Sequence, residues 1–186
     1  MDDDGGDEGD LVDRARGGEP DAWELLYRRA YPRLIAYARR RLATGEQAEE
    51  AVSETMVRAM GTIERYRPTS AGIQPWFFGI ARNVVLETYR AGSRQHPADP
   101  SRLGAVPSTA PTDPEHAVLA AEEHALLARA FGRLSTTDQD VLELRVLAGL
   151  GADAVAEITG RRAGAVRTAQ SRALARLRVE FDGLMA

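Results

Sequence analysis

The sequence contains no cysteine, which excludes disulfides, thiolate metal sites and cysteine nucleophiles. It also lacks an apolar run long enough to span a bilayer, and its first residues lack the basic and apolar segments of a signal peptide. We therefore expect a cytoplasmic protein with no direct membrane insertion. There is no HExxH motif, no glycine-rich phosphate loop and no serine nucleophile in a strand–turn–helix setting. The sequence thus predicts no enzyme, no catalytic residue, no cofactor and no metal site.

Lysine is absent as well, so all 24 basic residues are arginine. The formal net charge is −4, and such a chain has no overall electrostatic attraction to nucleic acid. Any binding to DNA must therefore come from local basic patches. With 186 residues, of which 44% are hydrophobic, the chain has room for one or two domains with real cores.

Apolar residues recur at helical spacing along most of the chain, and no strand pattern appears. We predict an all-α protein made of two small helical domains joined by a flexible linker. Pro32 is expected to start a new helix, because proline fits a first turn better than a helix interior. The arginines at 39–41, near the end of that helix, complement its dipole and need no ligand to explain them.

The predicted domain boundaries follow changes in composition. The first ten residues hold six acids and no base, which predicts a disordered acidic tail over residues 1–10. Five prolines, alternating with small and polar residues, predict the flexible linker over residues 91–115. The first helical domain then covers residues 11–90, and the second covers residues 116–186.

The second domain contains two short predicted helices joined by a tight turn at Gly160. Six arginines and no acid lie from Arg161 to Arg178, although the whole chain is net negative. Two short helices around a glycine turn are typical of a helix-turn-helix motif, whose second helix enters the major groove of DNA. Arginine suits that helix because its planar fork bonds phosphate oxygens or the edge of guanine. An arginine-rich surface helix without a ligand is the less favoured interpretation.

Two features of the first domain are ambiguous when taken alone. A helix predicted over residues 46–60 has an acidic outer face, which in most proteins is simply solvated. A loop with arginines precedes the helix that starts at Trp76, and an aromatic ring beside arginines can stack an unpaired base. Trp76 and Phe77 nevertheless fit a hydrophobic core better than a base-stacking site when no other observation is added.

Several segments together resemble one protein family. AEEAVSETMVRA (residues 48–59) and PWFFGIARNVVLETYR (residues 75–90) resemble region 2 of bacterial sigma factors. LSTTDQDVLELRVLAGL (residues 134–150) with the following helix-turn-helix resembles region 4. With only these two domains, the chain resembles an extracytoplasmic-function, or group IV, sigma factor of the sigma-70 family.

The resemblance implies a protein that binds core RNA polymerase and directs promoter recognition, DNA melting and transcription initiation. Its expected partners are promoter DNA, the β′ clamp helices and β flap of the polymerase, and an anti-sigma factor. The residues expected to bind core polymerase are Glu49, Glu50, Glu54, Thr55 and Arg58. Those expected to contact the single-stranded minus-ten element are Arg65, Arg67, Gln74, Trp76, Arg82 and Asn83. Those expected to read the duplex minus-35 element are Arg161, Arg162, Arg167, Thr168, Gln170, Ser171 and Arg172.

The resemblance is imperfect within the predicted recognition helix. Ala169 and Gln170 stand where the family often has Arg-Leu, so the sequence leaves the register of the inner face of this helix open. Two other protein classes also remain as alternatives. One is a stand-alone helix-turn-helix transcriptional regulator, and the other is a protein-interaction bundle whose arginines are only solvated.

Overall fold

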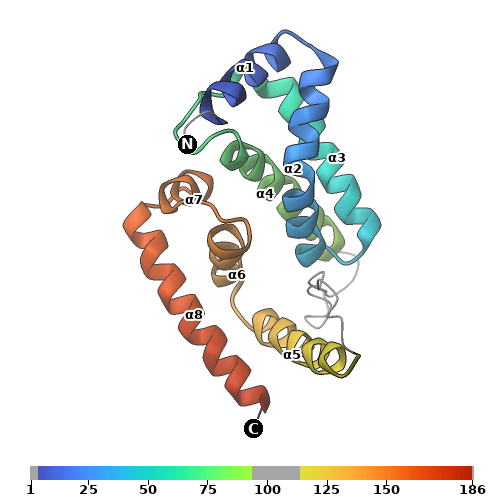
Figure 1. Cartoon of the computed structure of the whole chain (residues 1–186). Coiled ribbons are helices and arrows are strands. Elements are labelled where there is room, and N and C mark those ends of the chain that lie inside the picture. The colour runs from blue at the N-terminus through green and yellow to red at the C-terminus, as the bar shows by residue number, and fades with distance from the viewer. Residues whose placement is uncertain (1–3, 94–113, 186) are drawn as a thin grey trace.

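The computed structural model describes residues 4–93 and 114–185, and every regular element in this part of the chain is helical. The first half comprises α1 (Asp4–Arg16), α2 (Pro20–Arg41), α3 (Gly45–Thr62), the short 3₁₀ turn η1 (Ile63–Arg65) and α4 (Gln74–Ser93). The second half comprises α5 (Pro114–Gly132), α6 (Thr136–Leu142), the π-helical turn η3 (Glu143–Leu147), α7 (Ala152–Thr159) and α8 (Ala163–Met185). The prediction of an all-α fold in two helical parts is confirmed (Figure 1).

The N-terminal segment differs from the prediction of a disordered tail over residues 1–10, because α1 begins at Asp4. Three apolar side chains of α1 are buried, namely Leu11, Val12 and Ala15, each 2% exposed. The indole Nε1 of Trp23 on α2 also donates a hydrogen bond to the carbonyl oxygen of Ala15 at 2.9 Å. Tertiary packing therefore holds the helix despite its glycines, whose intrinsic helix propensity is poor.

The predicted break at Pro32 is also absent, because α2 continues through this residue to Arg41. A proline inside a helix loses one backbone hydrogen bond and costs about 3 kcal/mol. The apolar face of α2 keeps the same helical register on both sides of Pro32, with Ala30 and Leu34 both fully buried. Continuous burial of that face outweighs the local cost, so one long helix forms where two were expected.

The core of the first half lies between α2, α3 and α4. Phe77 and Phe78 of α4 are fully buried, and the ring of Tyr37 on α2 meets Phe78 edge-on with centroids 5.8 Å apart. Helix α3 starts at the N-cap Thr44, whose hydroxyl accepts a hydrogen bond from the amide of Gln47. The acidic residues of α3 face outward as the sequence predicts, and the buried residues on its inner side are Ala48, Ala51, Val52, Thr55, Met56 and Ala59.

The second half has only a small core of its own, formed by Leu134, Leu142 and Ala173. The hydroxyl of Ser135 caps α6, since it accepts a hydrogen bond from the amide of Asp138 at 3.2 Å. Leu144 of η3 and the buried residues of α7 instead join the core of the first half, and α7 packs on α4. The two halves therefore share one hydrophobic core in this arrangement. Within the described residues, no helix is both long enough and apolar enough to cross a membrane.

Replacing Phe78 by Ala should lower the free energy of unfolding by about 3–5 kcal/mol, because it empties a fully buried aromatic site. Urea denaturation followed by circular dichroism measures this loss. Tyr89→Ala is the matched control, since Tyr89 lies on the same helix but is 41% exposed. Equal destabilisation by the two substitutions would contradict the proposed position of the core.

Candidate polymerase and nucleic-acid interfaces

An acidic surface lies on the outer side of α3, opposite the buried side. Glu49 and Glu50 are exposed, and Glu54 is half-buried. Arg39 on α2 contacts Glu49 through Nη2 at 3.3 Å, whereas Glu50 has no ion-pair partner among the residues that the structure describes. This surface can accept a basic partner, because Glu50 is exposed and unpaired within the described part of the chain, and Glu49, although paired with Arg39, is also exposed.

Two of the residues expected to bind polymerase are used differently within the fold. Thr55 is 1% exposed and donates a hydrogen bond from its hydroxyl to the carbonyl oxygen of Ala51, so its side chain cannot touch a partner. Arg58 bridges α3 and α4, with Nε 2.7 Å from Glu54 and Nη2 2.8 Å from Glu87. Hydrogen bonds with Glu87 and Glu54 raise the pKa of Arg58. The Arg58–Glu87 hydrogen bond also lowers the pKa of Glu87.

The residues expected to contact single-stranded DNA lie in and around the loop between η1 and α4, residues 66–73. Arg65 ends η1, Arg67 lies in the loop, and α4 carries Gln74, Trp76, Arg82 and Asn83. Trp76 is half-buried at the start of α4, and its ring contacts those of Tyr66 and Phe77 in tilted geometry, with centroids 5.3 Å and 5.4 Å away. Arg65 and Arg67 are exposed. Arg65 and Arg67 thus offer guanidinium groups where the loop starts, and Trp76 offers a partly exposed indole just after it ends. Side chains of these two kinds suit phosphates and stacked bases.

Two of the residues predicted at this site, Gln74 and Arg67, are less available for contact with DNA, whereas Asn83 is exposed. Gln74 is half-buried, and its Oε1 has no hydrogen-bond partner among the described atoms. Arg67 already donates from Nη1 to the carbonyl oxygens of Glu64 and Tyr66. Asn83 is exposed about two turns beyond Trp76 along α4.

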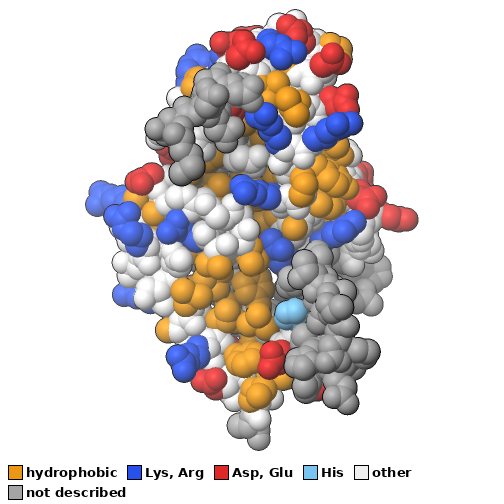
Figure 2. Space-filling view, in the orientation of Figure 1, with side chains coloured by type: hydrophobic (Ala, Val, Ile, Leu, Met, Phe, Trp, Pro, Cys, Tyr) orange, Lys and Arg blue, Asp and Glu red, His pale blue; other side chains and the backbone are white. Residues whose placement is uncertain are grey.

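The helix-turn-helix is formed by α7, the turn at Gly160 and α8. Gly160 has φ +68°, a left-handed conformation that ends α7, and its amide bonds back to the carbonyl oxygen of Glu157. The exposed side chains of Arg161 and Arg162 lie in this turn, directly before α8. Figure 2 shows basic side chains gathered over the α7–α8 end of the molecule.

The register of α8 follows from the residues that it buries. Val166 and Ala173 are fully buried, and Ala169 and Gln170 between them are half-buried, which settles the inner face that the sequence leaves open. Gln170 is held from inside, because its Oε1 accepts a hydrogen bond from Arg145 Nε at 2.9 Å. The side chains on the opposite, solvent-exposed face are Arg167, Thr168, Ser171 and Arg172.

A buried cluster of charges joins the two halves of the molecule. Arg41, at the end of α2, pairs with both Asp140 on α6 and Glu143 on η3. Arg40 lies 3.7 Å from Glu143, measured from Nε to Oε1. The exposed fractions are 8% for Arg41, 7% for Asp140 and 0% for Glu143. Burial raises the pKa of Glu143, and the neighbouring Arg41 and Arg40 oppose that rise.

Arg82, which is expected beside a DNA strand, belongs to the same cluster in this arrangement. Its Nη2 lies 2.8 Å and its Nε 3.2 Å from Asp140 Oδ2, a two-pronged contact across the interface between the halves. Arg82 is half-buried there and is therefore occupied by protein. The halves must separate before this guanidinium can bind a phosphate.

Comparison with known families and proteins places these features in one context. Residues 26–95 match the family Sigma-70 region 2, and residues 124–177 match Sigma-70, region 4. The chain is 33% identical over 182 residues to the ECF RNA polymerase sigma factor ShbA of Streptomyces griseus, covering 91% of this chain and 93% of ShbA. The chain belongs to the extracytoplasmic-function sigma factors. Proteins of this family are transcription initiation factors, and the predicted resemblance is confirmed.

Further similarities agree with this family but differ in extent. This sigma factor is 31% identical over 166 residues to the ECF RNA polymerase sigma factor BldN of Streptomyces coelicolor. The alignment covers 89% of this chain, which spans only 62% of the length of BldN.

Two solved structures share the fold of this sigma factor. CnrH in complex with the cytosolic domain of CnrY gives a TM-score of 0.70 at 22% identity, covering 93% of this chain and 96% of CnrH. The sigma factor RpoE in complex with the anti-sigma factor NepR from Bartonella quintana gives a TM-score of 0.67 at 19% identity, covering 86% of this chain and 96% of RpoE. At these identities the likeness concerns the fold alone.

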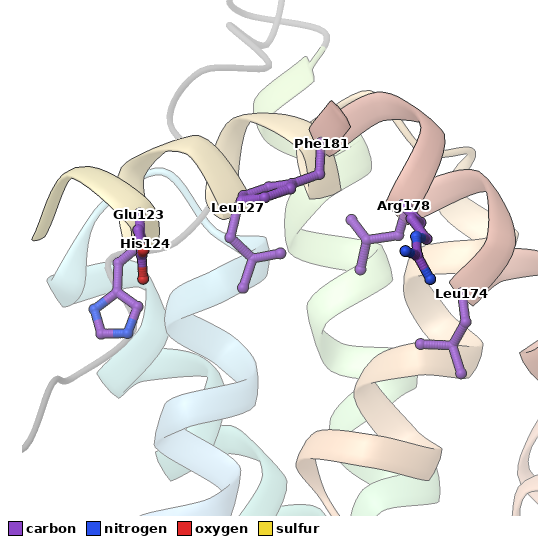
Figure 3. Close-up of a pocket in the computed structure, with 7 residues that line it drawn as sticks. Glu123, His124, Leu127, Leu174, Arg178 and Phe181 are labelled. Carbon is purple, nitrogen blue, oxygen red and sulfur yellow. The ribbon is translucent and has the colours of Figure 1, made fainter. Parts of the chain in front are cut away.

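An apolar groove lies between α5 and α8 in the region 4 half of this sigma factor. It encloses about 330 Å³, and Figure 3 shows Phe181 of α8 reaching toward Leu127 of α5. Leu127 is 40% exposed and Leu174 is 44% exposed, so the groove presents apolar surface to solvent. Charged or titratable groups also line it, namely Glu123, His124 and Arg178. No group of three or more residues that could hold a metal ion occurs in residues 4–93 and 114–185.

Sequence reasoning missed the charge cluster between the halves. It assigned the arginines at 39–41 to the helix dipole, whereas Arg40 and Arg41 reach across to acids of the second half. One signal was present in the sequence. Asp140 and Glu143 are three residues apart, on one face of a helix, inside the apolar run of Val141, Leu142 and Leu144. Acids within such a run are buried only when they are paired, so this spacing predicts buried cationic partners.

Replacing Asp140 by Asn should open the two halves, because Arg41 and Arg82 then lose a shared buried counter-charge. Removal of one partner from a buried ion pair typically costs about 3–5 kcal/mol. We expect a larger radius of gyration by small-angle X-ray scattering, with the helical circular dichroism signal retained. Asp153→Asn is the control, since Asp153 is an exposed acid on α7. Identical scattering from wild type and Asp140→Asn would contradict a decisive role for the cluster.

Proposed function

We propose that this sigma factor binds core RNA polymerase, reads a promoter at two places and opens the DNA between them, while the polymerase makes the RNA. The observation that carries the proposal is a combination of three features in one chain of this family. They are the acidic α3 face, the loop over residues 66–73 with Trp76 after it (the aromatic loop), and the arginine-rich helix-turn-helix. The protein itself performs no chemistry in this scheme. It acts where the polymerase is, in the cytoplasm.

The minus-35 element is read by the exposed face of α8. Arg167, Thr168, Ser171 and Arg172 project from a helix whose opposite side is anchored by Val166 and Ala173. Such a helix fits the major groove, where arginine recognises guanine edges and binds phosphates. Arg161 and Arg162 lie at the N-terminal end of α8, where phosphate contacts would fix its register on the duplex. Gln170 is a further candidate for this contact, and the hydrogen bond from Arg145 fixes the position of its side chain.

The minus-ten element is read as a single strand by the loop over residues 66–73 and the start of α4. Trp76 offers a half-buried ring for stacking, and Arg65 and Arg67 offer charges for the backbone. Gln74 and Asn83 supply amide groups beside this path. Arg82 joins the site only after it leaves Asp140, so promoter reading requires separation of the two halves.

Binding to core polymerase supplies the energy for that separation. The acidic face of α3, with Glu49, Glu50 and Glu54, docks on the β′ clamp helices, and Arg58 keeps α3 and α4 together behind it. The apolar groove between α5 and α8 takes the β flap. The polymerase offers two separate docking sites, one for each half, and so holds the halves apart. Because residues 94–113 join the halves, binding of one half raises the effective concentration of the DNA-reading surface on the other.

An anti-sigma factor regulates the protein in this proposal. RpoE of Bartonella quintana is a sigma factor of the same fold, and its structure contains the anti-sigma factor NepR. An inhibitor that favours the closed arrangement would keep Arg82 paired with Asp140 and would compete for the groove between α5 and α8. A protein of this kind needs no contact with DNA in order to block transcription.

Run-off transcription with purified core polymerase tests the proposal. We expect promoter-specific transcripts only when this protein is added, from start sites mapped by sequencing RNA ends. The isolated protein should bind the same promoters weakly, because its net charge is −4 and Arg82 is paired with Asp140. Tight promoter binding without polymerase, and no promoter-dependent transcript with it, would instead indicate a stand-alone helix-turn-helix regulator.

Replacing both Arg167 and Arg172 by Ala should weaken promoter use and make its salt dependence shallower. Each lost phosphate contact reduces the slope of log K against log salt by about one. Promoter affinity of the holoenzyme, titrated at several salt concentrations, measures both effects. Arg28→Ala serves as the control, because Arg28 is an exposed arginine of α2 paired with Glu24. An unchanged slope would mean that these arginines are only solvated.

Replacing Glu50 by Arg should weaken binding to core polymerase, because it reverses the charge of an exposed carboxylate on the α3 face. A rim charge acts mainly through electrostatic steering, so the association rate should fall and become less sensitive to salt. Surface plasmon resonance with immobilised core enzyme measures that rate. Glu24→Arg is the matched reversal on α2, outside the proposed docking face, and it should leave the rate unchanged. Equal effects of the two reversals would count against docking through α3.

A further inference from the structure

Helix α1 holds both ends of the loop over residues 66–73. At one end, Arg16 donates from Nη2 to the carbonyl oxygen of Tyr66 at 2.7 Å. At the other end, the carboxylate of Glu8 accepts a hydrogen bond from the amide of Ile73 at 2.7 Å. Between these two anchors, residues 67–71 are exposed. A helix outside the loop therefore fixes where the loop starts and where it ends.

The contact of Glu8 is built into the start of α4. The carbonyl oxygen of Ile73 accepts hydrogen bonds from the amides of Trp76 and Phe77, so Ile73 is the residue from which the helix begins. The free amides at a helix N-terminus carry a partial positive charge, and a carboxylate there is stabilising. Glu8 supplies that carboxylate from a position 65 residues earlier in the chain. The same negative charge, after the larger effect of burial, raises the pKa of Tyr66.

Gly72 is the position that makes this approach possible. Its φ of +73° is a conformation that side chains rarely adopt, and its amide closes a turn onto the carbonyl oxygen of Thr69 at 3.0 Å. A Cβ atom at this position would lie 2.7 Å from Glu8 Oε1 and 3.1 Å from Oε2. Glycine therefore serves both the turn and the entry of the carboxylate.

We propose that Glu8 and Arg16 are positioning residues, which hold the loop over residues 66–73 in the shape that reads the minus-ten strand. The inference rests on the proposed function of that loop. Glu8 acts through the Ile73 amide and does not itself touch DNA. A loop that is fixed before binding loses less conformational freedom on binding. It should therefore hold the bases of the DNA strand more tightly and discriminate between them more strictly. The N-terminal acidic segment thus contributes to promoter recognition through the protein backbone.

The test compares Glu8→Ala, Glu8→Gln and Gly72→Ala with wild type, and uses Asp10→Ala as the control. Asp10 is an exposed acid on the same helix, so its loss changes the charge of α1 without touching the loop. Each protein is assembled with core polymerase and titrated with a forked DNA that carries the mapped minus-ten element as a single strand. The same forks with each minus-ten base replaced measure discrimination.

We expect Glu8→Ala to lose about tenfold in affinity for the cognate fork, the size of one charge-assisted hydrogen bond, and to lose discrimination between bases. Glu8→Gln keeps an acceptor and should lose less. Gly72→Ala should resemble Glu8→Ala, and the double variant should lose less than the sum of the two. Affinity for core polymerase and for a duplex with only the minus-35 element should stay unchanged. Hydrogen exchange at the Ile73 amide of the free protein should accelerate in Glu8→Ala and not in Asp10→Ala.

Three results would overturn the inference. One is that Glu8→Ala discriminates bases as well as wild type does. Another is that it loses affinity for polymerase and for the minus-35 duplex to the same degree, which indicates a structural role only. The third is tighter binding of the fork, which indicates that Glu8 occupies a place that DNA takes. If wild-type holoenzyme itself showed no preference among minus-ten bases, the proposed function of the loop would fail first, and the inference would fall with it.

Discussion

The arrangement of the whole molecule depends on one buried meeting of charges between its halves. Arg41 on one side and Asp140 and Glu143 on the other are almost completely removed from water, a situation that is stable only while the partners stay together. Such a cluster contributes little net stability compared with apolar packing, but it allows only one way of joining the halves. It therefore specifies the closed arrangement more strongly than it stabilises it.

Under the proposed function, this constraint would keep the protein inactive without any change in the local structure of its proposed reading surfaces. The aromatic loop and the exposed face of α8 keep their local structure in the closed arrangement, while Arg82 is occupied by Asp140. Opening then requires a partner that binds the separated halves better than they bind each other. A multisubunit polymerase can do so because it offers two distant docking sites at once.

The helices, the buried side of α3, the capping Ser135 and the turn at Gly160 could be predicted from the sequence, since each depends on local spacing or on a single residue. What could not be predicted depends on contacts between distant segments. The acidic N-terminus was taken for a disordered tail because its composition is polar, yet Glu8 meets Ile73 far along the chain. Pro32 was taken for a helix start, because local propensity does not show that one apolar face continues on both sides. The pairing of Arg41 and Arg82 with buried acids likewise required the packing of two domains.

The unbroken α2 has a consequence for what lengths this chain tolerates. Its 22 residues span about 33 Å as one rod, with Trp23 bonded to α1 near one end and Arg41 in the charge cluster at the other. Each residue of a helix turns its side chain by about 100°. One inserted or deleted residue would therefore rotate Arg41 away from its acids while Trp23 stayed in place. The phase between these two side chains can be kept only by changes of whole helical turns.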